Sequence, residues 1–301
     1  DLHLSIRRQR QMCIRDRYNE NRFGIVRDDV VYDVSDVVKS ELPPYRYPLP
    51  IGDQLVANLE AMRPKLEQAA DTAPGKPVNE VSFLSPVANP TKIIGVPQNY
   101  EDHAQEATAD AGISQGLPRR KMEDQGLFLK ANSALTGPDE GVAIRFSDRR
   151  TDHEAELGVI IGRKGSDIPH DEALSYVGGY AIAMDMVVRG KEDRSFRKSV
   201  DTYAVLGPWL VTADEIDDPG QLDFVLTIDN EIRQQNNTRN LILNLQGQIA
   251  WASKFYTLYP GDIIMSGTCA GVGPVKPGDV MHLEFQHIGA MDVPVRAHET
   301  Y

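Results

Sequence analysis

The chain has 301 residues, of which 41% are hydrophobic and 25% charged, and its formal net charge is −12. This balance is typical of a globular protein and excludes an intrinsically disordered chain. No apolar run approaches the ~20 residues that cross a bilayer, and no stripe of lysine and arginine stands out that would attract nucleic acid. With only two cysteines, Cys13 and Cys269, a disulfide framework is not expected, and a reducing, cytoplasmic setting fits best.

The first 17 residues differ in composition from the rest of the chain, because they hold five arginines against two aspartates. No apolar segment of about 7–15 residues follows them, as a secretory signal would require. We therefore expect residues 1–17 to be non-native sequence or a disordered leader. Residues 18–85 are expected to form a small N-terminal accessory domain, and residues 90–301 the main domain.

The N-terminal segment combines a hairpin and a helix. Short β-branched runs between Arg22 and Val38 predict the hairpin, with Asp28 and Asp29 at its turn. A proline-rich stretch follows, and apolar residues at helical spacing then predict a helix from Asp53 to Ala70. Most of this segment carries no residue pattern that indicates chemistry.

The main domain is rich in short β patterns and has few helices. One helix is predicted over Arg239–Ser253, where leucine and isoleucine recur along one face. No glycine-rich phosphate-binding motif occurs, so a nucleotide cofactor is not indicated. This composition of elements predicts an α+β fold that is mainly β, not a regularly alternating α/β fold. The β predictions are strands at Glu156–Gly162, Tyr180–Val188 and Asp223–Asp229, and β runs after the Pro-Gly-Asp turns at residues 260–262 and 277–279.

Two acidic residues on one strand and a third inside an apolar run are the most informative feature of the chain. Because side chains alternate along a strand, Glu154 and Glu156 project from one face. Asp185 stands in the apolar run Tyr180–Val188, where an ionised carboxylate needs a partner. Two interpretations stay open: a solvated strand edge with an ion pair to Arg189, or one metal held by all three carboxylates. Such oxygen ligands suit Mg²⁺, Mn²⁺ or Ca²⁺, whereas zinc fits worse because no cysteine or histidine pair has ligand spacing.

Seven short motifs follow one another over roughly residues 90–296. They are Lys92-Ile-Ile-Gly95, Asn99-Tyr-Glu-Asp-His-Ala-Gln-Glu106, Phe128-Leu-Lys130, Glu154-Ala-Glu156, Gly179-Tyr180 leading to Asp185 and Arg189, Lys198-Ser-Val-Asp201 with Leu206-Gly-Pro208, and Gly267-Thr-Cys-Ala-Gly-Val-Gly273. Each motif is weak alone, but their order resembles the fumarylacetoacetate hydrolase family. The resemblance points to its acylpyruvate hydrolase and 2-hydroxyhepta-2,4-diene-1,7-dioate isomerase-like members.

This resemblance implies a fold, a cofactor and a set of site residues. The fold is a mixed β-roll or β-sandwich catalytic domain with a small N-terminal accessory domain, assembled as a homodimer or higher homo-oligomer. The cofactor is Mg²⁺, with Mn²⁺ or Ca²⁺ as alternatives, and the partner is a small oxo acid, with neither nucleic acid nor membrane expected. The implied metal ligands are Glu154, Glu156 and Asp185, the catalytic residues His103, Glu106 and Lys198, and the substrate contacts Lys130, Arg189, Gly267 and Thr268.

The second motif places two of these residues on one helix. Asn99 is expected to cap a helix that starts at Tyr100, so that His103 and Glu106 lie one turn apart on the same side. A glutamate that binds one imidazole nitrogen makes the other a better base. Taken alone, this spacing more often describes a plain surface pair, and only the neighbouring motifs favour a dyad. The polar stretch from Ala107 to Gln125 is expected to be a mobile lid, with a flexible surface loop as the plain alternative.

We predict a divalent-metal-dependent hydrolase that cleaves a carbon–carbon bond in a small acylpyruvate-type acid, which is a 2-oxo or 1,3-diketo acid. The alternative on the same metal site is an isomerase or decarboxylase of an unsaturated 2-oxo diacid, such as 2-hydroxyhepta-2,4-diene-1,7-dioate or an oxaloacetate-like acid. A non-catalytic metal-binding scaffold is the third interpretation, and the full set of site residues argues against it. Hydrolysis stands first because His103 with Glu106 favours a reaction that uses water.

Overall fold

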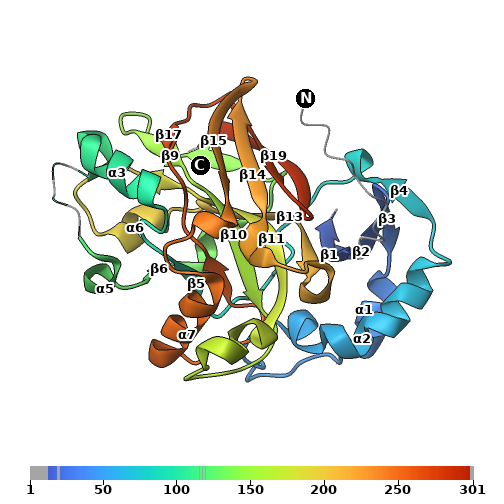
Figure 1. Cartoon of the computed structure of the whole chain (residues 1–301). Helices are drawn as coiled ribbons and strands as arrows, with labels where there is room; N and C mark the ends of the chain where they lie inside the picture. Colours follow the sequence, from blue (N-terminus) through green and yellow to red (C-terminus); the bar gives the residue numbers. More distant parts are fainter. Residues whose placement is uncertain (1–12, 19–20, 115, 117, 119, 299–301) are drawn as a thin grey trace.

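Figure 1 shows the computed structural model, which describes residues 13–18, 21–114, 116, 118 and 120–298. The predicted leader, residues 1–17, lies outside the described residues as far as residue 12, and the strand β1 (Cys13–Tyr18) begins directly afterwards. The division into domains at residues 18–85 and 90–301 stays a prediction. No helix in the described ranges is both long and apolar enough to cross a bilayer.

The N-terminal part of the chain forms a small antiparallel sheet with two helices below it, at the right of Figure 1. Its further elements are β2 (Arg22–Arg27), β3 (Val30–Asp33), β4 (Gly75–Pro77), α1 (Ser35–Glu41) and α2 (Gln54–Ala70). Asp28 and Asp29 have positive φ angles of 49° and 60° and make the predicted turn between β2 and β3. The predicted continuation of the hairpin to Val38 is wrong. The Asp33 carboxylate accepts the Ser35 N–H at 2.9 Å and the chain turns into α1, which buries Val38.

The predicted helix from Asp53 to Ala70 is confirmed as α2. One oxygen of the Asp53 carboxylate accepts the N–H groups of Leu55 and Val56 at 3.1 Å each, a cap that contributes about 1 kcal/mol. Its other oxygen accepts the Ala88 N–H at 2.9 Å and so fixes the segment that enters the main domain. The buried face of the helix packs into one apolar cluster with strands of the central sheet; it consists of Leu55, Val56, Leu59, Met62, Leu66 and Ala70.

A central mixed sheet carries the main domain, and in the described residues its strand order is β6-β5-β16-β10-β11-β13-β7. The strands are β5 (Ile93–Gly95), β6 (Phe128–Lys130), β7 (Leu135–Thr136), β10 (Ala155–Ile161), β11 (Val177–Asp185), β13 (Ala204–Thr212) and β16 (Ile263–Met265). Every residue of β10 and β13 is buried, which fits their mainly apolar sequences, with Glu156 as the charged exception in β10. The predicted strand at Glu156–Gly162 is confirmed as β10, shifted by one residue.

The predicted strand Tyr180–Val188 is in fact two strands. β11 ends at Asp185, and β12 (Val187–Val188) leaves the sheet to pair with β9 (Thr151–His153). Between them the Met186 N–H bonds to the Tyr203 carbonyl at 3.0 Å, which holds the change of direction. Asp185 therefore stands at the end of a sheet strand, where a side chain can face a cavity.

A second sheet packs beside the first, and two of its strands alternate between buried and more exposed side chains. Its strands are β8 (Val142–Ile144), β14 (Asp223–Ile228), β15 (Glu231–Asn237), β18 (Val280–Phe285) and β19 (Gly289–Ala297), and β17 (Gly273–Pro274) pairs with β9. The predicted strand at Asp223–Asp229 is confirmed as β14. Both Pro-Gly-Asp turns precede strands as predicted, since β16 follows the first and β18 the second.

Short helices gather at the left of Figure 1, where the site lies. They are α3 (Glu101–Ala109), α4 (Ala111–Ser114), α5 (Met122–Gln125) and α6 (Arg194–Lys198). The longer α7 (Leu245–Phe255) replaces the helix predicted over Arg239–Ser253, whose first six residues are not α-helical, because the Asn244 side chain caps the helix on the Gly247 N–H at 2.9 Å. The 3₁₀ turns are Val78–Glu80, Asn132–Ala134, His170–Tyr176, Ala213–Glu215, Pro219–Gln221 and Thr238–Asn240.

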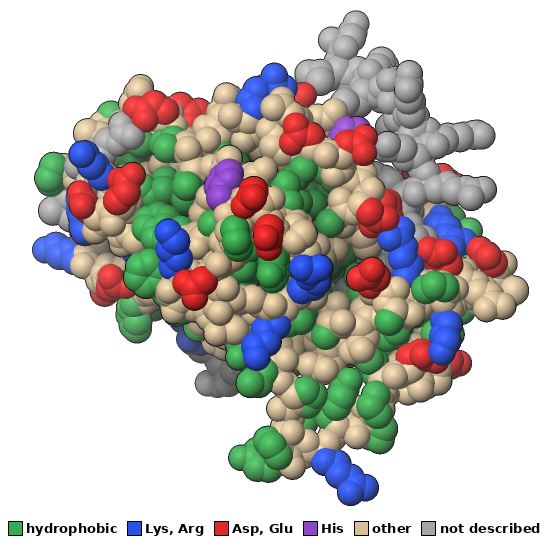
Figure 2. All heavy atoms as spheres, turned by 60° about the horizontal axis from the view of Figure 1, so that its bottom comes forward, with side chains coloured by type: hydrophobic (Ala, Val, Ile, Leu, Met, Phe, Trp, Pro, Cys, Tyr) green, Lys and Arg blue, Asp and Glu red, His purple; other side chains and the backbone are tan. Residues whose placement is uncertain are grey.

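The face of the molecule in Figure 2 carries acidic and basic side chains in small, interspersed groups. Lysine and arginine form no continuous stripe on this face. The proline-rich stretch exposes large apolar side chains, with Tyr47 94% exposed and Leu49 67% exposed.

Candidate active site

Strand register brings the three predicted carboxylates together. In the antiparallel pair β10–β11, Glu156 lies opposite Ala183, and the Asp185 N–H bonds to the Glu154 carbonyl at 2.9 Å. Residues directly opposite one another share a face of the sheet, and so do residues two apart on one strand. Ligand oxygens of Glu154, Glu156 and Asp185 all lie within 4.8 Å of one another, and the three side chains are buried. The three acidic side chains therefore lie together, as predicted, while their role as metal ligands stays a prediction.

Two buried lysines neutralise part of this acidic cluster. The Lys198 Nζ lies 2.5 Å from Glu154 Oε2 and 2.6 Å from Asp185 Oδ2, and the Lys130 ammonium pairs with the other oxygen of Asp185. Arg189 does not pair with Asp185, so the ion pair between these two residues, which the sequence left open as an alternative to a metal, is not formed. Its guanidinium instead contacts Asp152 at 2.8 Å and Glu154 at 3.3 Å.

The three carboxylates of the cluster differ in the cations that surround them. Burial raises the pKa of Glu154, but the nearby Lys198 and Arg189 outweigh it and lower that pKa to about 2. Burial and the neighbouring Asp185 instead hold the pKa of Glu156 well above its usual range, against the opposing effect of Lys198. Glu154 pairs with Lys198 and Arg189, and Asp185 pairs with Lys198 and Lys130. Within the described residues, Glu156 has no lysine or arginine nitrogen within 4.0 Å.

This donor set fits a divalent metal ion. All three ligands are carboxylate oxygens, which are the hard donors that Mg²⁺ and Mn²⁺ prefer. A buried carboxylate that no side-chain cation balances is stabilised by a metal ion or a proton, and a divalent ion supplies charge to the whole cluster. Glu154, Glu156 and Asp185 are the residues that would hold it.

The helix α3 presents the predicted dyad to the same cavity. The His103 Nδ1 lies 3.0 Å from Glu106 Oε2, and the other oxygen of Glu106 accepts the Gly271 N–H at 2.8 Å. Because the carboxylate accepts at Nδ1, that nitrogen carries the proton and Nε2 is left as the basic atom. His103 is only 5% exposed, so the pair is not the plain surface contact that its spacing alone favours.

Asn99 does not cap this helix, so that prediction is wrong. Its Nδ2 donates to the carbonyls of Leu243 at 3.0 Å and Ser266 at 2.7 Å, and its Oδ1 accepts the Leu243 N–H at 2.7 Å. Tyr100 stands at the N-cap position without a side-chain cap. Asn99 therefore joins the start of α3 to the segments that follow β16 and precede α7.

The loop of residues 267–273 connects the two halves of the site. The Gly267 N–H donates to Glu156 Oε2 at 2.7 Å, and the Thr268 hydroxyl donates to the Ala155 carbonyl at 2.9 Å. Gly267 has φ +99°, and a Cβ there would lie 2.5 Å from the Cβ of Asn99, so only glycine fits. The Gln234 Nε2 donates to the Thr268 hydroxyl at 2.7 Å from β15, a contact that no sequence motif indicated.

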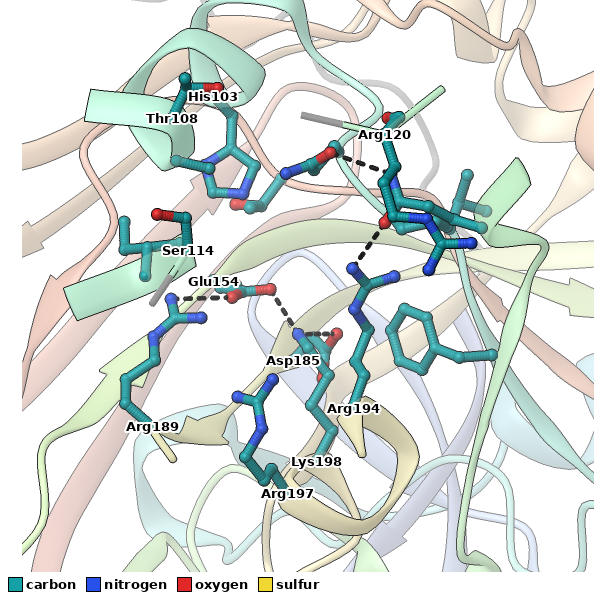
Figure 3. Close-up of a pocket in the computed structure, with 18 of the residues that line it drawn as sticks. His103, Thr108, Ser114, Arg120, Glu154, Asp185, Arg189, Arg194, Arg197 and Lys198 are labelled. Atoms are coloured by element: carbon teal, nitrogen blue, oxygen red, sulfur yellow. Dashed lines mark hydrogen bonds and ion pairs between the residues drawn. The ribbon is translucent and has the colours of Figure 1, made fainter. Parts of the chain in front are cut away.

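These side chains line a cavity of about 220 Å³. Figure 3 shows how His103, Glu154 and Asp185 lie around it. The predicted site residues that line it are His103, Glu154, Glu156, Asp185, Arg189, Lys198 and Thr268. Glu106, Lys130 and Gly267 lie outside the described lining and reach it only through their neighbours. Sequence reasoning missed Arg194, Arg197 and Arg120, which also line the cavity.

The stretch predicted as a lid lies along the cavity. Its lining residues among those described are Ala107, Thr108, Ile113, Ser114, Pro118, Arg120 and Gln125. Gln125 holds the stretch down, because its Nε2 donates to Gln98 Oε1 at 3.0 Å and its Oε1 accepts from Arg194 at 2.7 Å. Residues 115, 117 and 119 lie outside the described residues, and motion of the lid stays a prediction.

Cys269 stands beside Thr268 but offers no nucleophile. It is fully buried, and burial together with the charge of Asp102 raises the pKa of its thiol to about 12. At neutral pH the sulfur is therefore a neutral thiol, and only the thiolate attacks carbonyl carbon efficiently.

A family model described as fumarylacetoacetate (FAA) hydrolase C-terminal matches residues 92–296, and the chain belongs to this family. It is 50% identical over 283 residues to the maleylpyruvate hydrolase of Aquipseudomonas alcaligenes, which covers 93% of this chain and 98% of that protein. It is 36% identical, with a TM-score of 0.81, to the crystal structure of maleylpyruvate hydrolase from Sphingobium sp. SYK-6 in complex with manganese(II) ion and pyruvate, over 95% of this chain and 100% of that one. A mitochondrial oxaloacetate tautomerase of Homo sapiens is 36% identical over 231 residues, 72% of this chain and 70% of that protein.

These comparisons confirm the predicted family, the α+β fold class and the class of enzyme, a hydrolase that acts on a carbon–carbon bond of a keto acid. The Sphingobium structure contains manganese, and the acidic cluster of this chain can hold a metal ion. Magnesium as the working ion and the roles of the individual site residues stay predictions.

Proposed function

We propose that this chain hydrolyses an acylpyruvate of the maleylpyruvate type, releasing pyruvate and a carboxylic acid. The observation that carries the proposal is that three buried carboxylates and a histidine–glutamate pair face one cavity. The 50% identity to a maleylpyruvate hydrolase over nearly the whole chain supports the choice of substrate. Mg²⁺ is the proposed working ion, with Mn²⁺ or Ca²⁺ as alternatives.

The metal site defines where the pyruvyl end of the substrate binds. A divalent cation held by Glu154, Glu156 and Asp185 supplies, when bound, a Lewis acid for the 2-oxo acid. Thr268 and Arg189 also line the cavity and are proposed to orient the carboxylate of this end. Lys130 is not a lining residue of the cavity but supports the site, because its ammonium forms an ion pair with Asp185.

His103 is the proposed general base. The Glu106 carboxylate fixes the imidazole through Nδ1, and the Gly271 N–H fixes Glu106 in turn. Nε2 can then accept a proton from a water molecule in the cavity, and proton transfer of this kind contributes about 10²- to 10⁴-fold in rate. Lys198 places a positive charge beside the cluster, where it stabilises negative charge that develops on the attacked carbonyl oxygen.

The reaction balances with water as the only co-substrate. The water oxygen bonds to the distal carbonyl carbon, and its proton passes to His103. The bond between that carbon and the methylene carbon then breaks, and its electron pair stays with the methylene carbon as the enolate of pyruvate. Protonation of this carbon gives pyruvate, and the acyl part leaves as a carboxylic acid.

Tautomerisation or isomerisation of a 2-oxo diacid is the second candidate. The 36% identity to an oxaloacetate tautomerase favours it specifically, since such a reaction needs the same enolate chemistry without attack by water. We place this candidate second because the buried His103–Glu106 pair can activate a water molecule, which hydrolysis needs and tautomerisation does not. The proposal also includes a homodimer or higher homo-oligomer and a cytoplasmic setting.

An assay of purified protein against a substrate panel tests the proposal. The panel is maleylpyruvate, fumarylpyruvate, acetylpyruvate, oxaloacetate and an unsaturated 2-oxo diacid, each with Mg²⁺ and with EDTA. We expect loss of acylpyruvate absorbance, equimolar release of pyruvate and acid, and no turnover in EDTA. Conversion of oxaloacetate alone, without acid release, would support the second candidate instead. Metal binding without any turnover would favour the scaffold interpretation.

A further inference from the structure

The helix α6 presents three cations to the cavity. Arg194, Arg197 and Lys198 stand at positions i, i+3 and i+4 and line the cavity, whereas Phe196 between them is 73% exposed. The Asp193 side chain caps the helix by accepting the Ser195 N–H at 2.8 Å. Figure 3 shows Arg194 and Arg197 on either side of Lys198, all three rising from the same helix.

The cations that line the cavity differ in their partners. Lys198 and Arg189 are both paired with carboxylates of the reaction site. Arg194 instead donates to the neutral Gln125 Oε1 at 2.7 Å, and its Cζ lies 5.6 Å from the centre of the Phe128 ring. Among the described residues, Arg197 donates to two backbone carbonyls, those of Glu192 at 2.8 Å and Val188 at 3.4 Å. In the described part of the chain, neither Arg194 nor Arg197 has a carboxylate oxygen within 4.0 Å.

Two partly buried guanidinium groups with neutral partners are costly to keep side by side. Burial lowers the pKa of Arg197, and the charges of Arg189 and Arg194 lower it further. Burial also lowers the pKa of Arg194. A bound anion removes this repulsion and replaces lost hydration, and guanidinium forms paired hydrogen bonds with a carboxylate. The arrangement is that of a preformed anion site.

The position of this pair relative to the reaction site defines which anion it receives. Lys198 contacts the metal-ligand carboxylates, and Arg197 and Arg194 lie beside it on the same helix face. A substrate whose 2-oxo acid end binds at the acidic cluster can extend its acyl end along this face, because Arg194 and Arg197 line the same cavity. A methyl group at that end would leave both guanidinium groups without an anion, whereas a carboxylate satisfies them.

We propose that Arg194 and Arg197 bind a carboxylate at the acyl end of the substrate and so restrict the enzyme to dicarboxylic acylpyruvates. The inference rests on the proposed function, because it takes the other end of the substrate to lie at the acidic cluster. It assigns a specificity-determining role to two residues that carry no part of the bond cleavage.

Steady-state kinetics of Arg194→Gln, Arg197→Gln and the double variant test this inference. The two substrates are fumarylpyruvate, which ends in a carboxylate, and acetylpyruvate, which ends in a methyl group. We expect the wild type to prefer fumarylpyruvate, and each variant to raise KM for it about 10- to 100-fold, the worth of one charge-assisted hydrogen-bonded contact. The preference ratio of kcat/KM should fall by at least about tenfold, and Arg197→Lys should restore part of it.

Arg163→Gln is the matched control, because Arg163 is exposed and stacks on Tyr176 away from the cavity. It should leave the preference ratio unchanged. An equal fall of kcat/KM for both substrates in the α6 variants would overturn the inference, since it would show that the arginines only position Lys198 or the helix.

A binding measurement separates this inference from the proposed function. Calorimetric titration of the Mg²⁺-loaded protein with maleate, a dicarboxylate that cannot be cleaved, reports the anion site without any turnover. We expect maleate affinity to fall about tenfold or more in Arg194→Gln and Arg197→Gln and to stay unchanged in Arg163→Gln. If the wild type cleaves neither acylpyruvate but shows this pattern, the proposed function fails and the anion site stands. If maleate binds all variants equally, the anion site fails whatever the turnover.

Discussion

Asp185→Asn is expected to abolish metal-dependent hydrolysis, lowering kcat/KM by about 1,000-fold or more and metal affinity by more than about 100-fold. The substitution keeps the shape of the side chain and removes one negative charge. Lys130 and Lys198 both pair with Asp185, so the variant leaves two ammonium groups beside a weakened acidic cluster. The site would then attract a divalent cation less strongly, because it has lost one negative charge and keeps both ammonium groups. Isothermal titration with Mn²⁺ and the acylpyruvate assay measure the two losses.

Asp214→Asn is the matched control for this experiment. Asp214 is also an aspartate in an ion pair, with Arg63 at 2.7 Å, but its side chain is 60% exposed and is not among the residues that line the cavity. We expect that variant to bind Mn²⁺ and turn over substrate like the wild type. Unchanged Mn²⁺ affinity in a folded Asp185→Asn protein would show that this carboxylate is no ligand.

His103→Gln is expected to lower kcat for hydrolysis by about 10²- to 10⁴-fold while metal affinity stays within about threefold. Glutamine retains a polar group near Glu106 and Gly271 but has no basic nitrogen. The carboxylates that hold the metal come from β10 and β11, whereas His103 comes from α3, so the metal site should survive. Stopped-flow assay of acylpyruvate decay and Mn²⁺ titration together measure this separation.

The control for the histidine is His282→Gln on β18. His282 is partly exposed and pairs with Asp292 and Glu284 on the second sheet, outside the described lining of the cavity. Its loss should leave turnover unchanged. Normal hydrolysis by His103→Gln would refute the assignment of the base and leave water activation to another group.

Strand geometry predicted only part of the acidic cluster, and the full set of three carboxylates was implied by the family resemblance. Alternation places Glu154 and Glu156 on one face, and an antiparallel neighbour places Asp185 opposite Glu154. The family resemblance adds the order of the motifs, which joins His103 to the same site. These parts follow from short-range rules and from residues that stand within recognisable motifs.

The partners of the cluster could not be predicted from the residues alone. Lys130 contacts Asp185 from the edge strand β6, which is not adjacent to β11 in the order of the central sheet, and no local pattern predicts that contact. Gln234 reaches Thr268 from a different sheet. The spacing of Arg194, Arg197 and Lys198 was a usable signal, since it places three cations on one face of a helix.

The wrong local predictions share one cause, which is competition for side-chain hydrogen bonds. Asn99 is a good helix cap by type, but three backbone groups of distant segments occupy its amide. Asn244 caps α7 and so moves the start of that helix beyond Arg239. Asp33 ends a strand that β-branched residues alone would have continued. In each case one polar side chain decides where an element begins or ends.

The central claim is that three acidic side chains of two adjacent strands hold one divalent ion, and anomalous diffraction from Mn²⁺-loaded crystals tests it most directly. The account predicts a single strong anomalous peak with an oxygen of each of Glu154, Glu156 and Asp185 at about 2.0–2.5 Å. A peak elsewhere, or no peak beside these carboxylates at saturating Mn²⁺, would contradict it.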